Sequence, residues 1–236
     1  MRIFLAGASG AIGLPLTAML VAAGHEVTGT TRSADGAATI SAAGARAVIV
    51  DVFDAADLHV AVVASRPEVV IHQVTSLTLK PGEELSDEQL ARNAEVREVG
   101  TSNLIEAAVA AGAQRVVAQS IAWLYLPGPE PHIETESIVP ADPRATDRTR
   151  RGVSELERLV TTDPRLEGVV LRYGRLYGPG TWAATPPEPP TVHVDAAARA
   201  AALAVDHGEP GVYNIVDDDG PVSNARARRL LGWLPG

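Results

Sequence analysis

The segment Arg2-Ile3-Phe4-Leu5-Ala6-Gly7-Ala8-Ser9-Gly10-Ala11-Ile12-Gly13 decides the fold of this chain. It begins with an apolar run of the kind that a buried parallel strand needs, and it continues into glycines at every third position. The next residues place Leu16, Met19, Leu20 and Ala23 on one face of a helix. A strand, a glycine turn and a helix in this order predict a dinucleotide site, with the pyrophosphate at the helix N-terminus.

The glycines of this turn have separate predicted roles. Gly7 lets the chain turn sharply, Gly10 lets the backbone approach a pyrophosphate, and Gly13 lets the helix lie close to the strand. The residues expected to contact the cofactor here are Gly7, Ser9, Gly10, Ala11, Ile12 and Gly13. The alternative is a glycine-rich turn that holds no ligand.

Composition limits the classes of protein and partner. The chain has 236 residues, 46% of them apolar, which suits one compact domain or one domain with a small appendage. The formal net charge of −9 argues against nucleic acid and anionic membranes as partners. We see no apolar run long enough to span a bilayer and no signal peptide, and the absence of cysteine fits the cytoplasm.

The second strand ends in a residue that bears on cofactor choice. The sequence runs Thr30-Thr31-Arg32-Ser33, without the carboxylate that binds the ribose hydroxyls in a NAD site. The planar guanidinium of Arg32 can pair with a 2′-phosphate, with Ser33 beside it. The sequence therefore favours NADP, with NAD possible, and the alternative is an exposed Arg at a strand end.

The glycine spacing resembles that of the short-chain dehydrogenase/reductase superfamily, in particular its extended branch, which includes nucleotide-sugar epimerases and dehydratases. Residues 99–108, 114–125 and 168–180 are similar to that branch's N-x-x-G-T-x-N-L-L-E-A-A, R-x-V-x-x-S-S-x-x-V-Y-G and L-R-x-x-N-V-Y-G-P-G segments. The resemblance implies an α/β fold, a Rossmann-like doubly wound parallel sheet with a reduced C-terminal substrate-binding part. The expected division is a cofactor domain over 1–178 and a substrate-side segment over 179–236, of which 191–216 returns to the main sheet.

The resemblance also implies further cofactor contacts along the sheet edge. Asp51 and Val52 match the family's pair that flanks the adenine. Tyr173 and Gly174 match the family's segment that passes under the nicotinamide. The expected contacts with the cofactor ribose are Val74, Thr75 and Ser76, and Ser120 is also expected to contact the cofactor. His72 is expected to be a buried strand residue, because no second metal ligand has matching spacing, and no metal site is predicted.

One departure from the family concerns the catalytic pair. The family carries Tyr-x-x-x-Lys on a helix that corresponds to 149–161, but alignment gives Thr149 and Val153, or Arg151 and Glu155 after a shift of two residues. The only lysine of the chain, Lys80, lies far upstream. The predicted substitutes are Ser120 as a hydrogen-bond donor and Tyr125 as a proton donor. The other groups considered are Tyr173, Thr149, His132 and Asp142.

Three functions remain open from the sequence. The first is an NAD(P)-binding oxidoreductase or epimerase-like enzyme that acts on a small molecule. The second is a non-catalytic NADP-binding sensor or partner protein. The third is an isomerase or cyclase that uses the same crevice without hydride transfer. The resemblance further implies a homodimer formed through helices at 88–111 and 149–161.

Overall fold

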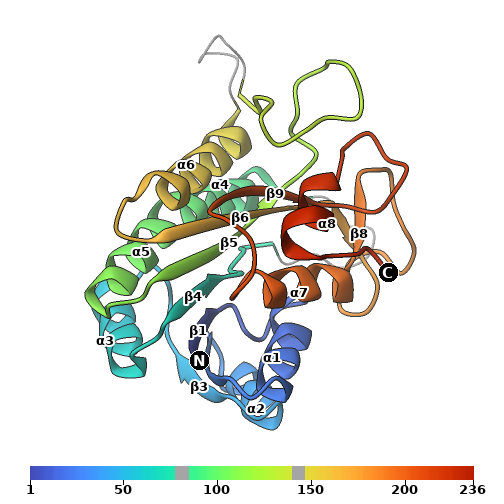
Figure 1. The fold of residues 1–236 in the computed structure, drawn as a ribbon. Helices are drawn as coiled ribbons and strands as arrows, with labels where there is room; N and C mark the ends of the chain where they lie inside the picture. Colours follow the sequence, from blue (N-terminus) through green and yellow to red (C-terminus); the bar gives the residue numbers. More distant parts are fainter. Residues whose placement is uncertain (78–84, 140–146) are drawn as a thin grey trace.

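The computed structural model describes residues 1–77, 85–139 and 147–236. Its centre is a parallel sheet of seven strands in the order β3-β2-β1-β4-β5-β6-β9 (Figure 1). These strands are β1 Arg2–Ala6, β2 Glu26–Thr31, β3 Arg46–Ile49, β4 Val69–His72, β5 Arg115–Ile121, β6 Glu167–Tyr173 and β9 Gly211–Ile215. The strand order reverses at β1, so ligands are expected at the C-terminal edge there.

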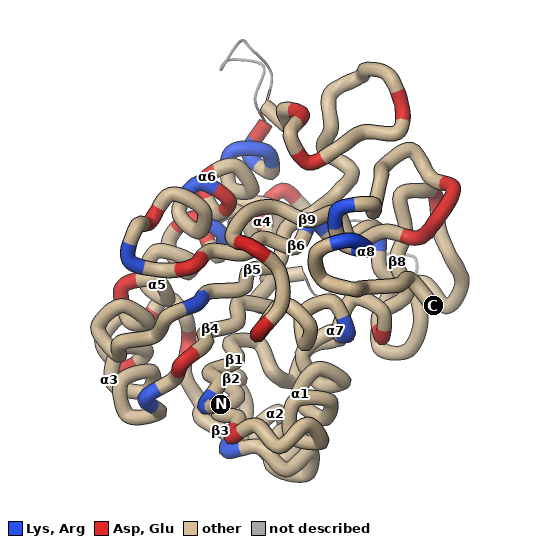
Figure 2. The backbone as a smooth tube through the Cα atoms, in the orientation of Figure 1, with Lys and Arg blue, Asp and Glu red and all other residues tan. Residues whose placement is uncertain are grey.

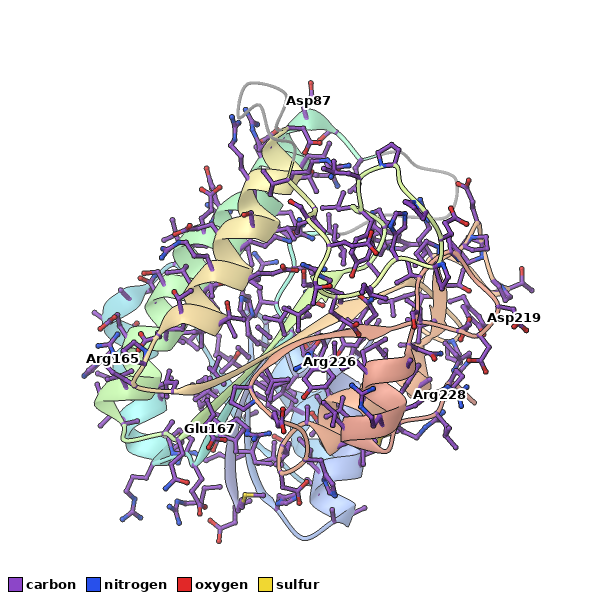
Figure 3. All side chains as sticks on the ribbon, turned by 45° about the horizontal axis from the view of Figure 1, so that its top comes forward. Asp87, Arg165, Glu167, Asp219, Arg226 and Arg228 are labelled. Carbon is purple, nitrogen blue, oxygen red and sulfur yellow. The ribbon has the colours of Figure 1, made fainter. Side chains whose placement is uncertain are left out.

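Helices cover both faces of the sheet (Figure 1). The helices are α1 Gly13–Ala22, α2 Ala34–Ala42, α3 Ala55–Ser65, α4 Asp87–Glu95, η1 Val96–Gly100, α5 Thr101–Ala110, α6 Arg148–Thr162, α7 Val194–Leu203 and α8 Ala225–Leu231. One layer contains α3, α4, α5 and α6, and α1 packs against α7 in the other. In Figure 3, Asp87 at the start of α4 and Arg165 just beyond α6 mark opposite ends of the first layer.

The apolar run of β1 is explained by burial on both faces. Ile3 and Leu5 belong to the core cluster under α1 and α7, whereas Phe4 and Ala6 belong to the cluster under α3 and α5. Side chains alternate between the two faces of a strand, so a strand covered on both sides must be apolar throughout. The predicted Rossmann-like fold is therefore confirmed.

The C-terminal part is short and returns to the sheet. After β6 the chain forms a small two-stranded sheet of β7 Arg175–Tyr177 and β8 Thr191–His193. It then forms α7 and β9, and β9 extends the main sheet beside β6. The segments around Gly174 and Thr191 approach closely because residue 174 is a glycine. A Cβ at this position would lie 2.5 Å from the Thr191 backbone.

Some elements differ from the sequence expectations. The helix expected over 88–111 contains a π-helical segment, η1, between α4 and α5. The helix α2 follows Ser33, whose side chain caps it, and is absent from the sequence expectations. Lys80 and Asp142 lie outside the described residues. Within the described ranges, none of the helices combines the length and the hydropathy required to cross a bilayer.

Candidate functional site

Two glycines of the turn, Gly7 and Gly13, have no room for a side chain. Gly7 has a φ of +85°, and a Cβ there would lie 2.9 Å from the Gln73 backbone. A Cβ on Gly13 would lie 2.1 Å from the Gly7 carbonyl oxygen. At Gly10 the only neighbour of such a Cβ is the Gly7 oxygen at 3.3 Å, so this part of the turn faces open space. The turn thus brings the start of α1 against the ends of β1 and β4.

The first turn of α1 offers backbone donors to an anion. Within the described residues, the N–H groups of Ala11, Ile12 and Gly13 donate to no protein acceptor, whereas Leu14 donates to Gly10. The helix carries no acidic residue in its first turn. Free N–H groups and the positive end of the helix dipole together favour a phosphate.

A cavity of about 310 Å³ opens beside this turn. Nine predicted cofactor residues line it, namely Gly7, Ser9, Gly10, Arg32, Ser33, Asp51, Val52, Val74 and Thr75. The other lining residues are Thr30, Thr31, Val50, Phe53, Gln73 and Val96, which the sequence did not single out. Thr31, Val50, Phe53 and Gln73 adjoin predicted positions in the sequence, whereas Val96 does not and required the tertiary structure.

The remaining predicted cofactor residues lie outside this cavity wall. Ala11, Ile12 and Gly13 are at the start of α1, and Ser76 donates its backbone N–H to Asn93. Ser120, Tyr173 and Gly174 lie further along the sheet edge, on β5 and at the end of β6. They could meet the nicotinamide half of a dinucleotide, because its two halves lie on either side of the point where the strand order reverses.

Arg32 stands at the cavity mouth with a carboxylate nearby. Its Nη1 lies 4.0 Å from Oδ2 of Asp51, and its side chain is 59% exposed. Asp51 also accepts the backbone N–H of Phe53, which fixes the carboxylate at the end of β3. The guanidinium is therefore oriented by a weak, solvent-exposed pair and is free to turn toward an incoming anion.

Gln73 provides a test of whether the site fits a cofactor. Its amide nitrogen donates to the hydroxyl of Tyr173 at 3.2 Å, and burial raises the pKa of that tyrosine. Its Oε1 is buried and has no partner in the described structure. A buried acceptor without a donor is costly unless a ligand supplies one. The free N–H groups of α1, the exposed Arg32 and this acceptor fit a dinucleotide.

The two predicted catalytic residues belong to one buried polar network. The Ser120 hydroxyl donates to Oε1 of Glu157 at 2.7 Å, and Glu157 is paired with Arg172. Arg172 donates to the Tyr125 hydroxyl, which donates to Oδ1 of Asn214, each at 2.8 Å. Burial raises the pKa of Tyr125. Both hydroxyls are already bonded, so a proton-donor role for either remains a prediction.

The place of the family's catalytic pair is apolar. Val153 is fully buried and packs in a cluster with Ile121, Tyr125 and Val216. Thr149 is half-buried near the start of α6. In the shifted register, Arg151 is exposed and Glu155 pairs with Arg158 on the outer face. Neither register brings an ionisable pair to the sheet edge.

His72 is held as a neutral ring. Its Nδ1 accepts the backbone N–H of Val74, and its Nε2 lies 3.1 Å from the Thr101 hydroxyl. Burial lowers the pKa of His72 to about 4, with the charge of Arg97 adding to the effect. Within the described residues no three His, Cys, Asp or Glu side chains are placed to hold a metal ion.

Comparison with known proteins finds a matching family and a related reductase. A model of the NAD dependent epimerase/dehydratase family matches residues 3–191. A Streptomyces protein named 3-diazoavenalumate denitrifying reductase is 40% identical over 256 residues, covering 100% of this chain and 80% of the relative.

Solved structures agree with the fold. A UDP-glucose 4-epimerase from Thermotoga maritima, with UDP-glucose, superposes with a TM-score of 0.80 at 20% identity, covering 100% of this chain and 94% of the other. The Thermus thermophilus UDP-glucose 4-epimerase in complex with NAD has a TM-score of 0.74 at 25% identity, with coverage of 100% and 85%. The glycine turn, the parallel sheet and these matches together show that the chain belongs to the NAD-dependent epimerase/dehydratase family of enzymes.

Proposed function

We propose that this chain is an NADP-dependent reductase that replaces the diazo group of a small, carboxylate-bearing molecule by hydrogen. The observation that carries the proposal is the buried Val153, packed among apolar side chains where the family has its lysine. The 40% identity to a denitrifying reductase of a diazo compound supports the same chemistry.

The chemistry explains why a proton-donating pair is dispensable. Epimerases and alcohol dehydrogenases exchange a proton with a substrate hydroxyl, a step for which general acid–base groups contribute roughly 10²–10⁴-fold. In reductive denitrification the C–N bond breaks and its electron pair leaves with N2. A C–H bond forms with the hydride that bound NADPH supplies. The diazonium group of the carboxylate and NADPH would thus give the carboxylate with hydrogen in place of the diazo group, N2 and NADP⁺, with no proton taken from the protein.

The residues of the chain have binding and shielding roles in this proposal. The N–H groups of Ala11, Ile12 and Gly13 bind the diphosphate, and Arg32 binds the 2′-phosphate. Gln73 Oε1 accepts a hydrogen bond from the cofactor. The apolar cluster around Val153 keeps water from the reacting carbon. Asp51 and Val52 contact the adenine, and the riboses and nicotinamide contact Val74, Thr75, Ser76, Ser120, Tyr173 and Gly174.

The decisive experiment uses an aromatic diazo carboxylate stabilised by an ortho hydroxyl. With NADPH deuterated at the transferable position of C4, the purified protein is expected to release one N2 per NADPH oxidised and to place deuterium on the former C–N carbon. UDP-glucose serves as the comparison substrate and is expected to remain unchanged. Epimerisation of UDP-glucose without consumption of the diazo compound would refute the proposal, and cofactor binding without turnover of either would favour a sensor.

We also infer a homodimer through α4, α5 and α6. A hollow of about 710 Å³ is lined by residues of η1, α5 and α6 and includes the half-exposed Val99. Its rim carries Glu98 and Arg151, and both signs of charge follow α6 (Figure 2). A twofold contact could pair these charges across the interface. Light scattering should give twice the chain mass, and Val99→Arg should give the monomer.

A further inference from the structure

A second buried cation lies beside the network of Glu157 and Arg172. Arg97 is on the π-helical segment η1, and it is only 7% exposed. Its charge acts on His72 at the end of β4, and Glu157 of α6 acts on it in turn. The segment η1 packs against α6, and both couplings act across this packing, so Arg97 lies on the α6 side of η1 near the C-terminal end of β4.

Within residues 1–77, 85–139 and 147–236, no carboxylate forms an ion pair with Arg97. Glu157 already forms a bidentate pair with Arg172 and accepts the Ser120 hydroxyl. Burial lowers the pKa of Arg97 to about 10, which Glu157 partly offsets, so the guanidinium stays protonated at neutral pH. Among the described residues, the side chain of Arg97 has no hydrogen bond and no ion pair.

The head of Arg97 still reaches accessible space. Within the described ranges, the fully buried side-chain nitrogen and oxygen atoms without a partner are Gln73 Oε1 and Arg226 Nε. The nitrogens of Arg97 are not among them, although they too lack partners. A guanidinium has five N–H donors, and leaving them unpaired in a largely dehydrated place is costly. An anion that enters from the sheet edge would satisfy both the donors and the charge.

The position of Arg97 separates it from the cofactor phosphates. Val96 lines the cofactor cavity, but Arg97 does not. Arg97 therefore lies outside the cavity wall, on a segment that packs against α6. The diphosphate has its own donors at α1, and Arg32 serves the adenosine side.

We propose that Arg97 binds the carboxylate of the substrate and thereby selects anionic substrates. The inference rests on the proposed function for the identity of the substrate, but its geometry does not depend on the reduction step. Arg is suited to this role because its fork can hold both carboxylate oxygens.

The test is a binding measurement that requires no turnover. The protein saturated with NADP⁺ is titrated by calorimetry with 4-hydroxycinnamate and with its primary amide, which has the same shape without the charge. The acid is expected to bind at least about tenfold more tightly than the amide. Arg97→Met should remove that preference, and Arg97→Lys should keep part of it, while the Kd of NADP⁺ and the melting temperature show that each variant is folded.

The matched control is Arg92→Met on the preceding helix turn. Arg92 pairs with Glu95 and lies over the Phe53 ring, so its loss should leave the acid preference unchanged. Equal binding of acid and amide by the natural sequence, no binding of the acid, or a retained preference in Arg97→Met would each overturn the role of Arg97. Diazo turnover that continues in those cases would leave the proposed function standing. An acid preference without diazo turnover would refute only the proposed function.

Discussion

The carboxylate of Glu157 and the guanidinium of Arg172 form a two-pronged pair, with Oε1 to Nε at 2.8 Å and Oε2 to Nη2 at 2.7 Å. Their side chains are 10% and 5% exposed, so both charges are largely removed from water. The pair joins α6 to β6, and its bonds to Ser120 and Tyr125 extend the connection to β5 and the loop after it. Its integrity therefore determines how α6 sits against the sheet.

Glu157→Gln should destabilise the protein by about 3–5 kcal/mol, because Arg172 is left buried with no opposing charge. Urea unfolding followed by circular dichroism measures the free energy of unfolding. Glu155→Gln is the control, since Glu155 pairs with Arg158 on the exposed face of the same helix and should cost at most about 1 kcal/mol. Equal losses in the two variants would contradict a structural role for the buried pair.

Tyr125→Phe should lower stability by about 1–2 kcal/mol, because the hydroxyl bridges Arg172 and Asn214. If denitrification needs no protein proton, kcat should change by less than about threefold, whereas a general acid would lose at least about tenfold. Ser120→Ala tests the other predicted hydroxyl in the same assay. A large drop in kcat with an unchanged free energy of unfolding would restore the proton-donor hypothesis.

Arg32→Gln should weaken NADPH binding by about tenfold or more and leave NADH binding nearly unchanged, because the proposed partner of the guanidinium is the 2′-phosphate, which NADH lacks. Fluorescence titration with both nucleotides gives the two Kd values. Asp51→Asn should act in the opposite direction, since it removes a negative charge 4.0 Å from Arg32. Equal affinity of the natural sequence for the two nucleotides would count against NADP as the cofactor.

Gly13→Ala should abolish dinucleotide binding, because its methyl group would lie 2.1 Å from the Gly7 carbonyl oxygen and force the turn open. The same titration checks the loss, and the melting temperature reports the accompanying strain. Gly220→Ala is a suitable control, since its nearest neighbour is the Pro189 Cβ at 4.0 Å. Unaltered binding in Gly13→Ala would mean that the cofactor lies elsewhere.

His72 should make the protein less stable as the pH falls from about 6.5 toward 4. Burial lowers the pKa of the folded state to about 4 from 6.5, so in this interval the unfolded chain takes up a proton that the native chain refuses. Above pH 6.5 both states hold His72 neutral and the free energy of unfolding is unaffected. By pH 4 the free energy of unfolding is lower by about 3 kcal/mol. His72→Gln should flatten this dependence in urea titrations at several pH values, and an unchanged slope would assign it to other groups.

The framework of the fold could be predicted because its signals are local. The alternation of Ile3 and Leu5 with Phe4 and Ala6 follows from burial on both faces of one strand. The steric need for glycine at positions 7 and 13 likewise arises at a single turn of the chain. Such features depend on neighbours within a few residues, which a sequence displays directly.

The contacts within the candidate site could not be predicted from the sequence, because they depend on the tertiary structure. Glu157 gave no signal in the sequence, since its partners Ser120 and Arg172 are 37 and 15 residues away. The unpaired state of Arg97 and of Gln73 Oε1 is also a property of the assembled core. The apolar spacing predicted one helix over 88–111 but did not indicate the π-helical segment η1 within it.

The π-helical segment η1 joins α4 and α5 into one continuous helix and rotates the side-chain positions of α5 about the helix axis relative to those of α4. Its hydrogen bonds span one residue more than those of an α-helix, which turns α5 by about 100° relative to α4. The helix α4 packs against α6, whereas α5 packs mainly against α3 and also contacts α6 and β4. Deleting one residue from η1 would rotate α5 relative to α4 and turn the buried Leu104 or Asn93 away from its present position, so the length of this segment is itself constrained.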